Sequence, residues 1–167
     1  TGQKHKGLAA VRYPRGYSQG EDIDLDDVTI EIGKSRIIQK GSKIAYLVFG
    51  TLLNTVNKVA KKNGGTVIDM RFVKPIDEDM IIDICNTHDY IFTVEDNVIL
   101  GGAGTAVNEV MTKYSLKNDL VNIGIPDKII PHGNQDEILS ELDLDELGIE
   151  KITNDHIHNM VEISNKK

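Results

Sequence analysis

The segment Tyr13-Pro14-Arg15-Gly16 has the residue types that an anion-binding loop requires. Proline fixes its own φ angle and restrains the residue before it, and glycine permits backbone angles that other residues avoid. An arginine on so short and stiff a link presents its planar guanidinium with little loss of entropy, and phosphate and carboxylate fit that fork best. Arg15 is therefore a candidate phosphate ligand. A surface arginine beside a turn would show the same pattern, and Arg12 is expected to pair with an acid.

The run Gly101-Gly102-Ala103-Gly104 stands between a predicted strand and a predicted helix, where some proteins hold a phosphate on backbone N–H groups. The dinucleotide-binding fingerprint requires a third small residue, but Val107 occupies that position, and Val121-Asn122 stands where an acidic residue would bind a ribose. A P-loop would end in Gly-Lys-Ser/Thr, which is missing. We expect these glycines to start a helix, with phosphate binding as the alternative.

Two further segments follow predicted strands, where open α/β sheets gather their ligands. Arg71 to Asp77 joins a strand to a helix, and its Pro75 and Asp77 are explained by helix initiation alone. Glu95-Asp96-Asn97 contains carboxylates that could transfer protons, but no histidine stands nearby as a partner. We expect a solvated or helix-capping role for these acids.

The remaining reactive side chains form no catalytic or metal-binding set. His156 and His158 are two positions apart, which places them on different sides of a helix, and His88 and His132 stand alone. Cys85 lies on an apolar helical stripe, so we interpret it as a core residue. The sequence therefore predicts no catalytic residue, no cofactor ligand and no metal ligand in this chain.

Composition excludes several classes of protein. The chain has 167 residues, a formal net charge of −7 and a hydrophobic fraction of 40%, which suits one globular core rather than a nucleic-acid or anionic-membrane binder. No apolar run is long enough for a membrane-spanning helix. The single cysteine cannot form an internal disulfide and fits a reducing compartment such as the cytoplasm. Because the chain starts at Thr1 without Met, we expect it to be excised from a longer protein.

Strand patterns alternate with helical patterns along most of the chain. Helical periodicity follows Thr51, Asp77 and Asn134, which are expected to cap helices, and a last amphipathic helix carries Ile149 to Val161 on one stripe. The predicted strands are Ser35–Gln39, Lys43–Phe49, Thr66–Met70, Tyr90–Val94 and Leu120–Ile123, with a further short strand possible over Leu8–Tyr13.

This alternation predicts an α/β fold, a three-layer sandwich around a mostly parallel five-stranded sheet. The turn Lys40-Gly41-Ser42 would join Ser35–Gln39 to the next strand as a hairpin, and Ser35–Gln39 would therefore be an antiparallel edge strand. An acidic stretch ends near Asp27, so residues 1–27 are expected to be the end of a preceding domain and a linker, and residues 28–167 the main domain.

Several motifs in register resemble the C-terminal part of the 1-deoxy-D-xylulose-5-phosphate synthase family. They are Ala10 to Gly16, Asp69 to Asp77, Thr93 to Asn97 with Gly101 to Gly104, and Asn122 to Asp127, and the resemblance extends from about Leu8 to Leu147. Asp96 stands where that family usually has a second glutamate, and Tyr17-Ser18-Gln19 also departs from its common residues.

The resemblance implies a fold like the transketolase C-terminal domain and a homodimeric, thiamine-diphosphate-dependent, cytoplasmic parent enzyme. That parent would condense pyruvate with glyceraldehyde 3-phosphate, losing carbon dioxide, for isoprenoid and thiamine biosynthesis. Thiamine diphosphate and Mg²⁺ would be bound by domains outside this chain, so the chain alone is expected to be inactive. Arg15 aligns with the family arginine that binds the substrate phosphate.

Two other hypotheses stay open at this point. The chain could be a free-standing phosphate- or nucleotide-binding module that uses Gly101–Gly104, or the C-terminal domain of a 2-oxoacid dehydrogenase β subunit. The motifs Tyr13–Gly16 and Arg71–Asp77 favour the synthase over the dehydrogenase.

Overall fold

A computed structural model describes residues 1–13 and 29–165. It divides into two units, Thr1–Ile32 and Gly33–Lys167. In the first unit, a short 3-10 helix (Gly2–Lys4) is followed by residues 8–13, which form no strand, so the predicted strand over Leu8–Tyr13 is wrong. Arg15 and the acidic stretch to Asp27 lie outside the described residues.

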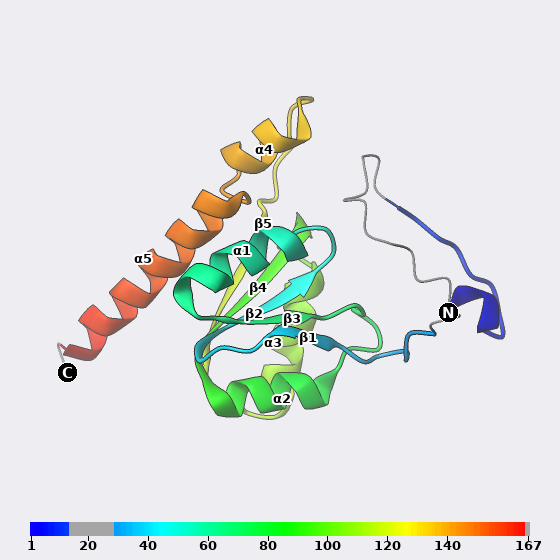
Figure 1. Cartoon of the computed structure of the whole chain (residues 1–167), viewed down its shortest axis with the longest axis horizontal. Coiled ribbons are helices and arrows are strands. Elements are labelled where there is room, and N and C mark those ends of the chain that lie inside the picture. The colour runs from blue at the N-terminus through cyan, green and yellow to red at the C-terminus, as the bar shows by residue number, and fades with distance from the viewer. Residues whose placement is uncertain (14–28, 166–167) are drawn as a thin grey trace. The chain divides into compact units, whose positions relative to one another are not determined.

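The second unit alternates strands and helices as the sequence pattern predicts (Figure 1). Its elements are β1 (Arg36–Gln39), β2 (Lys43–Phe49), α1 (Leu53–Asn63), β3 (Thr66–Asp69), α2 (Glu78–Thr87), β4 (His88–Val98), α3 (Ala103–Lys113), β5 (Asp119–Ile125), α4 (Gln135–Glu141) and α5 (Glu146–Asn165). None of the helices within the described ranges has the length and apolar character needed to cross a membrane.

The five strands form one sheet in the order β1-β3-β2-β4-β5. β2 pairs in parallel with both β3 and β4, and β4 pairs in parallel with β5, whereas β1 pairs antiparallel with β3 at the edge. The predicted five-stranded, mostly parallel sheet with one antiparallel edge strand is confirmed.

The predicted hairpin between the first two strands is wrong, because β3 lies between β1 and β2. The turn residues bind the start of β3 instead of closing a hairpin: Gly41 N donates to Thr66 Oγ1 at 2.9 Å, and Ser42 N donates to Gly64 O at 3.0 Å. A side chain at Gly41 would collide with the backbone of Gly64 and Gly65. Gly41 therefore allows two chain segments to pass close to each other. The same turn residues would be expected in a hairpin, so the sequence does not distinguish the two structures.

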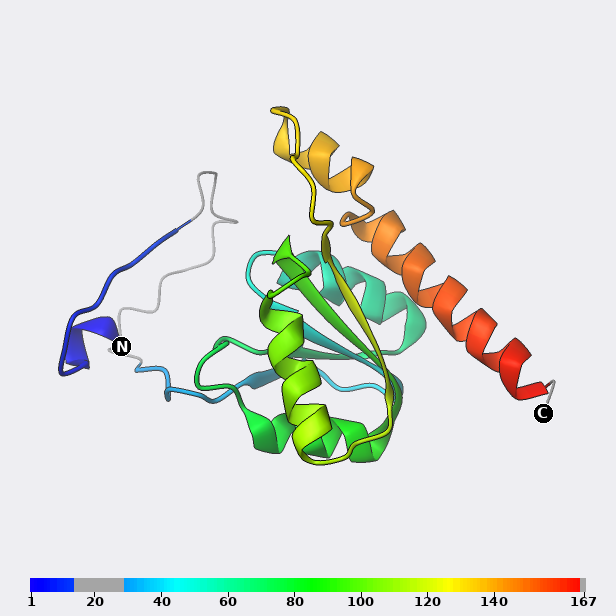
Figure 2. The same cartoon turned by 180° about the vertical axis from the view of Figure 1, so that it is seen from behind.

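Helices cover both faces of the sheet and complete the predicted three-layer sandwich (Figure 2). Successive β2 side chains point to opposite faces. Tyr46 and Val48 pack with α1 and with Ile149 of α5, whereas Leu47 and Phe49 pack with α2 and α3. This two-sided burial explains the nearly continuous apolar sequence of β2.

A buried chain of hydrogen bonds joins α1, β2 and α5. Asn63 Nδ2 donates to Tyr46 Oη at 2.7 Å, Tyr46 Oη donates to Thr153 Oγ1 at 3.0 Å, and Thr153 Oγ1 donates to Ile149 O at 2.8 Å. Tyr46 is fully buried, so these hydrogen bonds satisfy its hydroxyl group, which would destabilise the core if it had no partner. Along α5, Ile152 and Ile157 also pack on this core, but Val161 is 46% exposed, so the predicted apolar stripe ends earlier than expected.

Candidate functional site

The carboxyl ends of the parallel strands meet at one edge of the sheet, and the chain changes direction between β2 and β4. After β2 the chain adds β3 on one side, and β4 and β5 then follow on the other side. Ligands of open α/β sheets bind at such a switch point. A pocket of about 310 Å³ lies there, and we call it the switch-point pocket. Its lining residues are Phe49, Gly50, Val73, Glu95, Asp96, Asn97, Gly101, Gly102 and Ala103.

Glu95, at the carboxyl end of β4, caps the start of α3. Its carboxylate accepts hydrogen bonds from Ala103 N at 2.7 Å and from Gly104 N at 2.8 Å, and only 2% of the residue is exposed. The first N–H groups of a helix lack partners within the helix and attract negative charge. The chain's own carboxylate thus occupies the donors that a phosphate would use, which confirms a helix-capping role for Glu95.

The glycines at the start of α3 make room for this cap. A Cβ atom at Gly102 would collide with Val98 O and the Glu95 carboxylate, and one at Gly104 would lie 2.6 Å from Thr93 Oγ1. These glycines are therefore explained by close packing at a helix start, as the sequence predicts. The structure gives no support to phosphate binding at Gly101–Gly104, because the donors that would serve it are used.

Asp96 fixes the other side of the switch-point pocket. Its Oδ2 atom accepts a hydrogen bond of 2.6 Å from Thr51 Oγ1, so the end of β4 is linked to the loop that precedes α1. The predicted capping role of Thr51 is wrong: Leu52 occupies the cap position of α1, and no side chain caps that helix. The Thr51 hydroxyl binds a carboxylate from a distant strand instead, which local sequence could not show.

Arg71 lies at the end of β3 in a left-handed conformation with φ 58°. Asp69 Oδ2 lies 3.4 Å from Arg71 Nε and 3.4 Å from an Arg36 guanidinium nitrogen. These bonds tie the edge strand β1 to the end of β3. The contacts account for Arg71 as a structural residue at this edge of the sheet.

Asp77 caps α2, as the sequence predicts. Its carboxylate accepts hydrogen bonds from Met80 N at 3.3 Å, from Ser35 N at 2.8 Å and from Ser35 Oγ at 2.9 Å, and Lys34 Nζ lies 3.6 Å away. Burial raises the pKa of Asp77, but the Ser35 and Met80 hydrogen bonds and Lys34 outweigh it, so its pKa lies below the ordinary value. Asp77 thereby joins the segment before β1 to the start of α2.

The other reactive side chains lie apart from this edge. Cys85 packs in the core with 8% exposure, and burial raises its pKa to about 11, which confirms its prediction as a core residue. His156 Nε2 lies 3.0 Å from Asp119 Oδ2, and His158 Nε2 lies 3.1 Å from Glu162 Oε1. Within residues 1–13 and 29–165, no three His, Cys, Asp or Glu side chains are grouped so that they could hold a metal ion.

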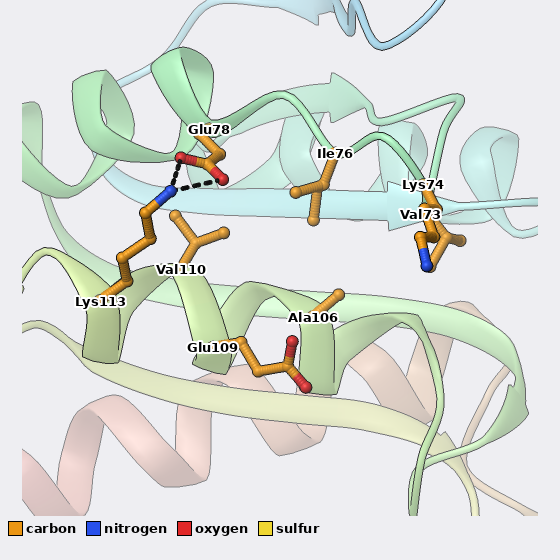
Figure 3. Close-up of a pocket in the computed structure, with 8 residues that line it drawn as sticks. All are labelled: Val73, Lys74, Ile76, Glu78, Ala106, Glu109, Val110 and Lys113. Carbon is orange, nitrogen blue, oxygen red and sulfur yellow. Dashed lines mark hydrogen bonds and ion pairs between the residues drawn. The ribbon is translucent and has the colours of Figure 1, made fainter.

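A second pocket, which sequence reasoning missed, lies between α2 and α3 (Figure 3). We call this pocket of about 350 Å³ the α2–α3 groove. At one end, Lys113 Nζ contacts both Glu78 oxygens at 2.7 and 3.0 Å, and Tyr114 Oη donates to Glu78 at 2.6 Å. The Lys113 hydrogen bond is the main reason that the pKa of Glu78 lies below its ordinary value. The lining residues are Val73, Lys74, Ile76, Glu78, Ala106, Glu109, Val110 and Lys113.

Residues 33–149 match the family model described as "Transketolase, C-terminal domain". The chain belongs to the transketolase C-terminal domain family. The solved structure of a "Split gene transketolase, inactive beta4 tetramer" shows the same fold, with a TM-score of 0.67 and 22% sequence identity over 75% of this chain and 41% of that chain. The three-layer architecture and the antiparallel edge strand are therefore those of a transketolase C-terminal domain.

Similar curated proteins are much longer than this transketolase C-terminal domain. The 1-deoxy-D-xylulose-5-phosphate synthase of Vibrio campbellii is 48% identical over 157 residues, which is 94% of this chain and 25% of that protein. The synthase of Pasteurella multocida is 54% identical over 151 residues, which is 90% of this chain and 24% of that protein. The chain spans about a quarter of the length of these relatives, and its resemblance to the synthase family is confirmed.

Proposed function

We propose that this domain is the C-terminal part of a 1-deoxy-D-xylulose-5-phosphate synthase. Sequence identity of 48% over 94% of the chain with a protein of that name carries the proposal. The parent enzyme would condense pyruvate with glyceraldehyde 3-phosphate and release carbon dioxide. It would be a homodimer in the cytoplasm, and residues 1–27 would be the end of its preceding domain and the linker.

Arg15 is the residue that we propose for binding the phosphate of glyceraldehyde 3-phosphate. The motif Tyr13-Pro14-Arg15-Gly16 supports it, because a guanidinium on a stiff loop suits a phosphate. Thiamine diphosphate and Mg²⁺ are assigned to the other domains of the parent. The helix N-terminus nearest to the switch-point pocket suits no diphosphate, since Glu95 already occupies its amides.

The arrangement at α3 also weighs against a free-standing phosphate- or nucleotide-binding module. Such a module would need free N–H groups at the start of α3, where both available donors instead bind a buried carboxylate. Titration of the chain with nucleotides or phosphate should leave its melting temperature unchanged. Real binding at 100 times Kd would add about 2.7 kcal/mol to the free energy of unfolding.

The substrate role of Arg15 is tested by steady-state kinetics of the full-length enzyme. We expect Arg15→Ala to raise KM for glyceraldehyde 3-phosphate by tenfold or more, since a charged hydrogen bond contributes about 1.5–3 kcal/mol, and to leave KM for pyruvate nearly unchanged. Arg12→Ala, three positions earlier in the same segment, is the matched control and should change neither constant. Equal effects of Arg15→Ala on both substrates would assign Arg15 a structural role.

The absence of activity in the isolated domain is a separate expectation. The chain should release no carbon dioxide from pyruvate in the presence of thiamine diphosphate and Mg²⁺, whereas the full-length enzyme should. Turnover by the chain alone would refute the assignment of the cofactor site to the other domains of the parent.

A further inference from the structure

Large apolar side chains are exposed where the parallel strands of the sheet end, and we call this side the carboxyl edge. Three loops start there, after β3, after β4 and after β5, and each carries one such side chain. Val73 is 49% exposed, Leu100 is 70% exposed and Ile129 is 96% exposed. Exposed apolar side chains that lie together on a surface mark a contact with another protein.

The three loops adjoin one another. Val73 lines the switch-point pocket together with Gly101, the neighbour of Leu100, so the loops after β3 and β4 meet there. Ile99 N donates a hydrogen bond of 3.0 Å to Ile125 O, the last residue of β5. The loop after β5 therefore starts beside the loop after β4, and the carboxyl edge forms one surface.

The opposite side of the sheet, the amino edge, has a different character. In the described part of the chain its loops are residues 40–42, 64–65 and 115–118, and none of them carries a large exposed apolar side chain. Tyr114, just before the last of these loops, is 44% exposed, but its hydroxyl group donates to Glu78 at 2.6 Å. An apolar contact is therefore expected at the carboxyl edge rather than at the amino edge.

The chain also enters this unit at the carboxyl edge. Because β1 is antiparallel to β3, its first residue, Arg36, pairs with Asp69, the last residue of β3. Just before β1, the backbone N–H and the hydroxyl group of Ser35 donate to Asp77 at 2.8 and 2.9 Å, which holds this entry against the start of α2. Polypeptide that precedes the unit is thus attached beside the loop that carries Val73.

We propose that the carboxyl edge is the surface that packs against the part of the parent enzyme that precedes this domain. The chain spans only 25% and 24% of two of its curated relatives, so a parent of their length has ample polypeptide to cover this edge. That polypeptide is linked to the same edge, which keeps its effective concentration there high, so a small apolar contact is enough. A second copy of the domain has no such link. The inference rests on the proposed function, because it takes the parent from it.

Hydrogen–deuterium exchange of the full-length enzyme and of this chain alone tests the contact. Peptides that contain Val73, Leu100 and Ile129 should exchange at least about tenfold more slowly in the full-length enzyme, because the contact protects their amides. Peptides that contain residues 40–42 and 115–118, at the amino edge, should exchange alike in both proteins. Equal exchange at the carboxyl edge in the two proteins would overturn the inference.

Amine-reactive cross-linking of the full-length enzyme identifies what covers the edge. Lys74 and Lys128 are exposed in loops of the carboxyl edge, and Lys40 and Lys117 are exposed at the amino edge. Lys74 and Lys128 should form links to peptides that precede this domain, whereas Lys40 and Lys117 should not. A link between two Lys74 side chains, which only two copies can form, would assign the edge to a second copy and contradict the proposal.

Leu100→Asp and Leu147→Asp are a matched pair of variants of the full-length enzyme. Leu147 is 73% exposed, nearly as much as Leu100, but it lies away from the carboxyl edge: its neighbour Glu146 pairs at 2.8 Å with Lys62, near the amino-edge end of α1. Leu100→Asp should speed exchange of the other carboxyl-edge loops at least about fivefold, and Leu147→Asp should leave it unchanged. Both variants should keep the melting temperature of this chain alone, because both side chains are exposed. Equal effects of the two variants would refute the contact.

None of these measurements uses catalysis. Fast exchange at the carboxyl edge of an active full-length enzyme would reject the contact and keep the proposed reaction. Slow exchange there in an enzyme that does not condense pyruvate with glyceraldehyde 3-phosphate would reject the reaction and keep the contact.

Discussion

Replacing Glu95 with glutamine should remove about 3 kcal/mol from the free energy of unfolding. The carboxylate is 2% exposed and accepts two backbone hydrogen bonds, of 2.7 and 2.8 Å, at the start of α3. Glutamine has nearly the same shape but only one acceptor oxygen. Its amide group would face one of the two backbone N–H groups, so one donor loses its partner in a buried place.

Two effects set this magnitude. A hydrogen bond to a charged group contributes about 1.5–3 kcal/mol, and a negative charge at a partly buried helix N-terminus contributes up to about 2 kcal/mol. The two effects overlap, because the interaction of the charge with the helix N-terminus is made through the same two hydrogen bonds. They therefore do not add in full, and the expected loss is about 3 kcal/mol. For a domain of this length, that corresponds to a fall of about 10 °C in melting temperature.

Thermal and urea unfolding at pH 7 measure the loss, and Asp96→Asn is the matched control. It makes the same chemical change at the next residue, where the carboxylate is exposed and accepts one hydrogen bond from Thr51. We expect about 1 kcal/mol or less for the control. If Glu95→Gln were no more destabilising than Asp96→Asn, Glu95 would not be the cap of α3 in solution.

Two further perturbations follow from the pKa shifts. Because the pKa of Asp77 is lower in the folded than in the unfolded chain, the stability that its carboxylate contributes is present above about pH 4 and is lost as the pH falls through the folded pKa. The difference in unfolding free energy between the native chain and Asp77→Asn should be about 1.5–3 kcal/mol at about pH 6–7 and should shrink below about pH 4. A pH-independent difference would contradict this. Because the pKa of Cys85 is raised to about 11, the folded chain should react with iodoacetamide at pH 8 about a hundredfold more slowly than the unfolded chain. Similar rates in the two states would show that the thiol is accessible.

Much of the fold could be predicted because its signals are local. The apolar run of β2 reflects burial on both faces, and Asp77 precedes a helical pattern in the way a cap does. The failures at Gly41 and Thr51 have one cause. Both residues donate hydrogen bonds to partners that are distant in sequence, Gly41 N to Thr66 and the Thr51 hydroxyl to Asp96, and local propensity then predicts the wrong structure.

The candidate site was less predictable for the same reason. A carboxylate at a strand end, followed by glycines at a helix start, is consistent with a cap or with an acid–base group, and only the two short bonds of Glu95 decide between them. The α2–α3 groove joins Lys74, from a loop, to Glu109, from a later helix, and no spacing in the sequence connects them. The family of the chain, by contrast, could be predicted from contiguous motifs, whereas the role of Arg15 stays a prediction.

The buried chain of hydrogen bonds through Tyr46 limits where this domain can be truncated at its C-terminus. The family match stops at residue 149, yet Thr153, which accepts the hydrogen bond from Tyr46 Oη, lies beyond it in α5. Shortening the chain to the matched range would leave the buried Tyr46 hydroxyl without its acceptor. It would also remove Ile152 and Ile157, which pack on the same core. Recombinant pieces of related enzymes should therefore retain this terminal helix if they are to stay monodisperse and folded.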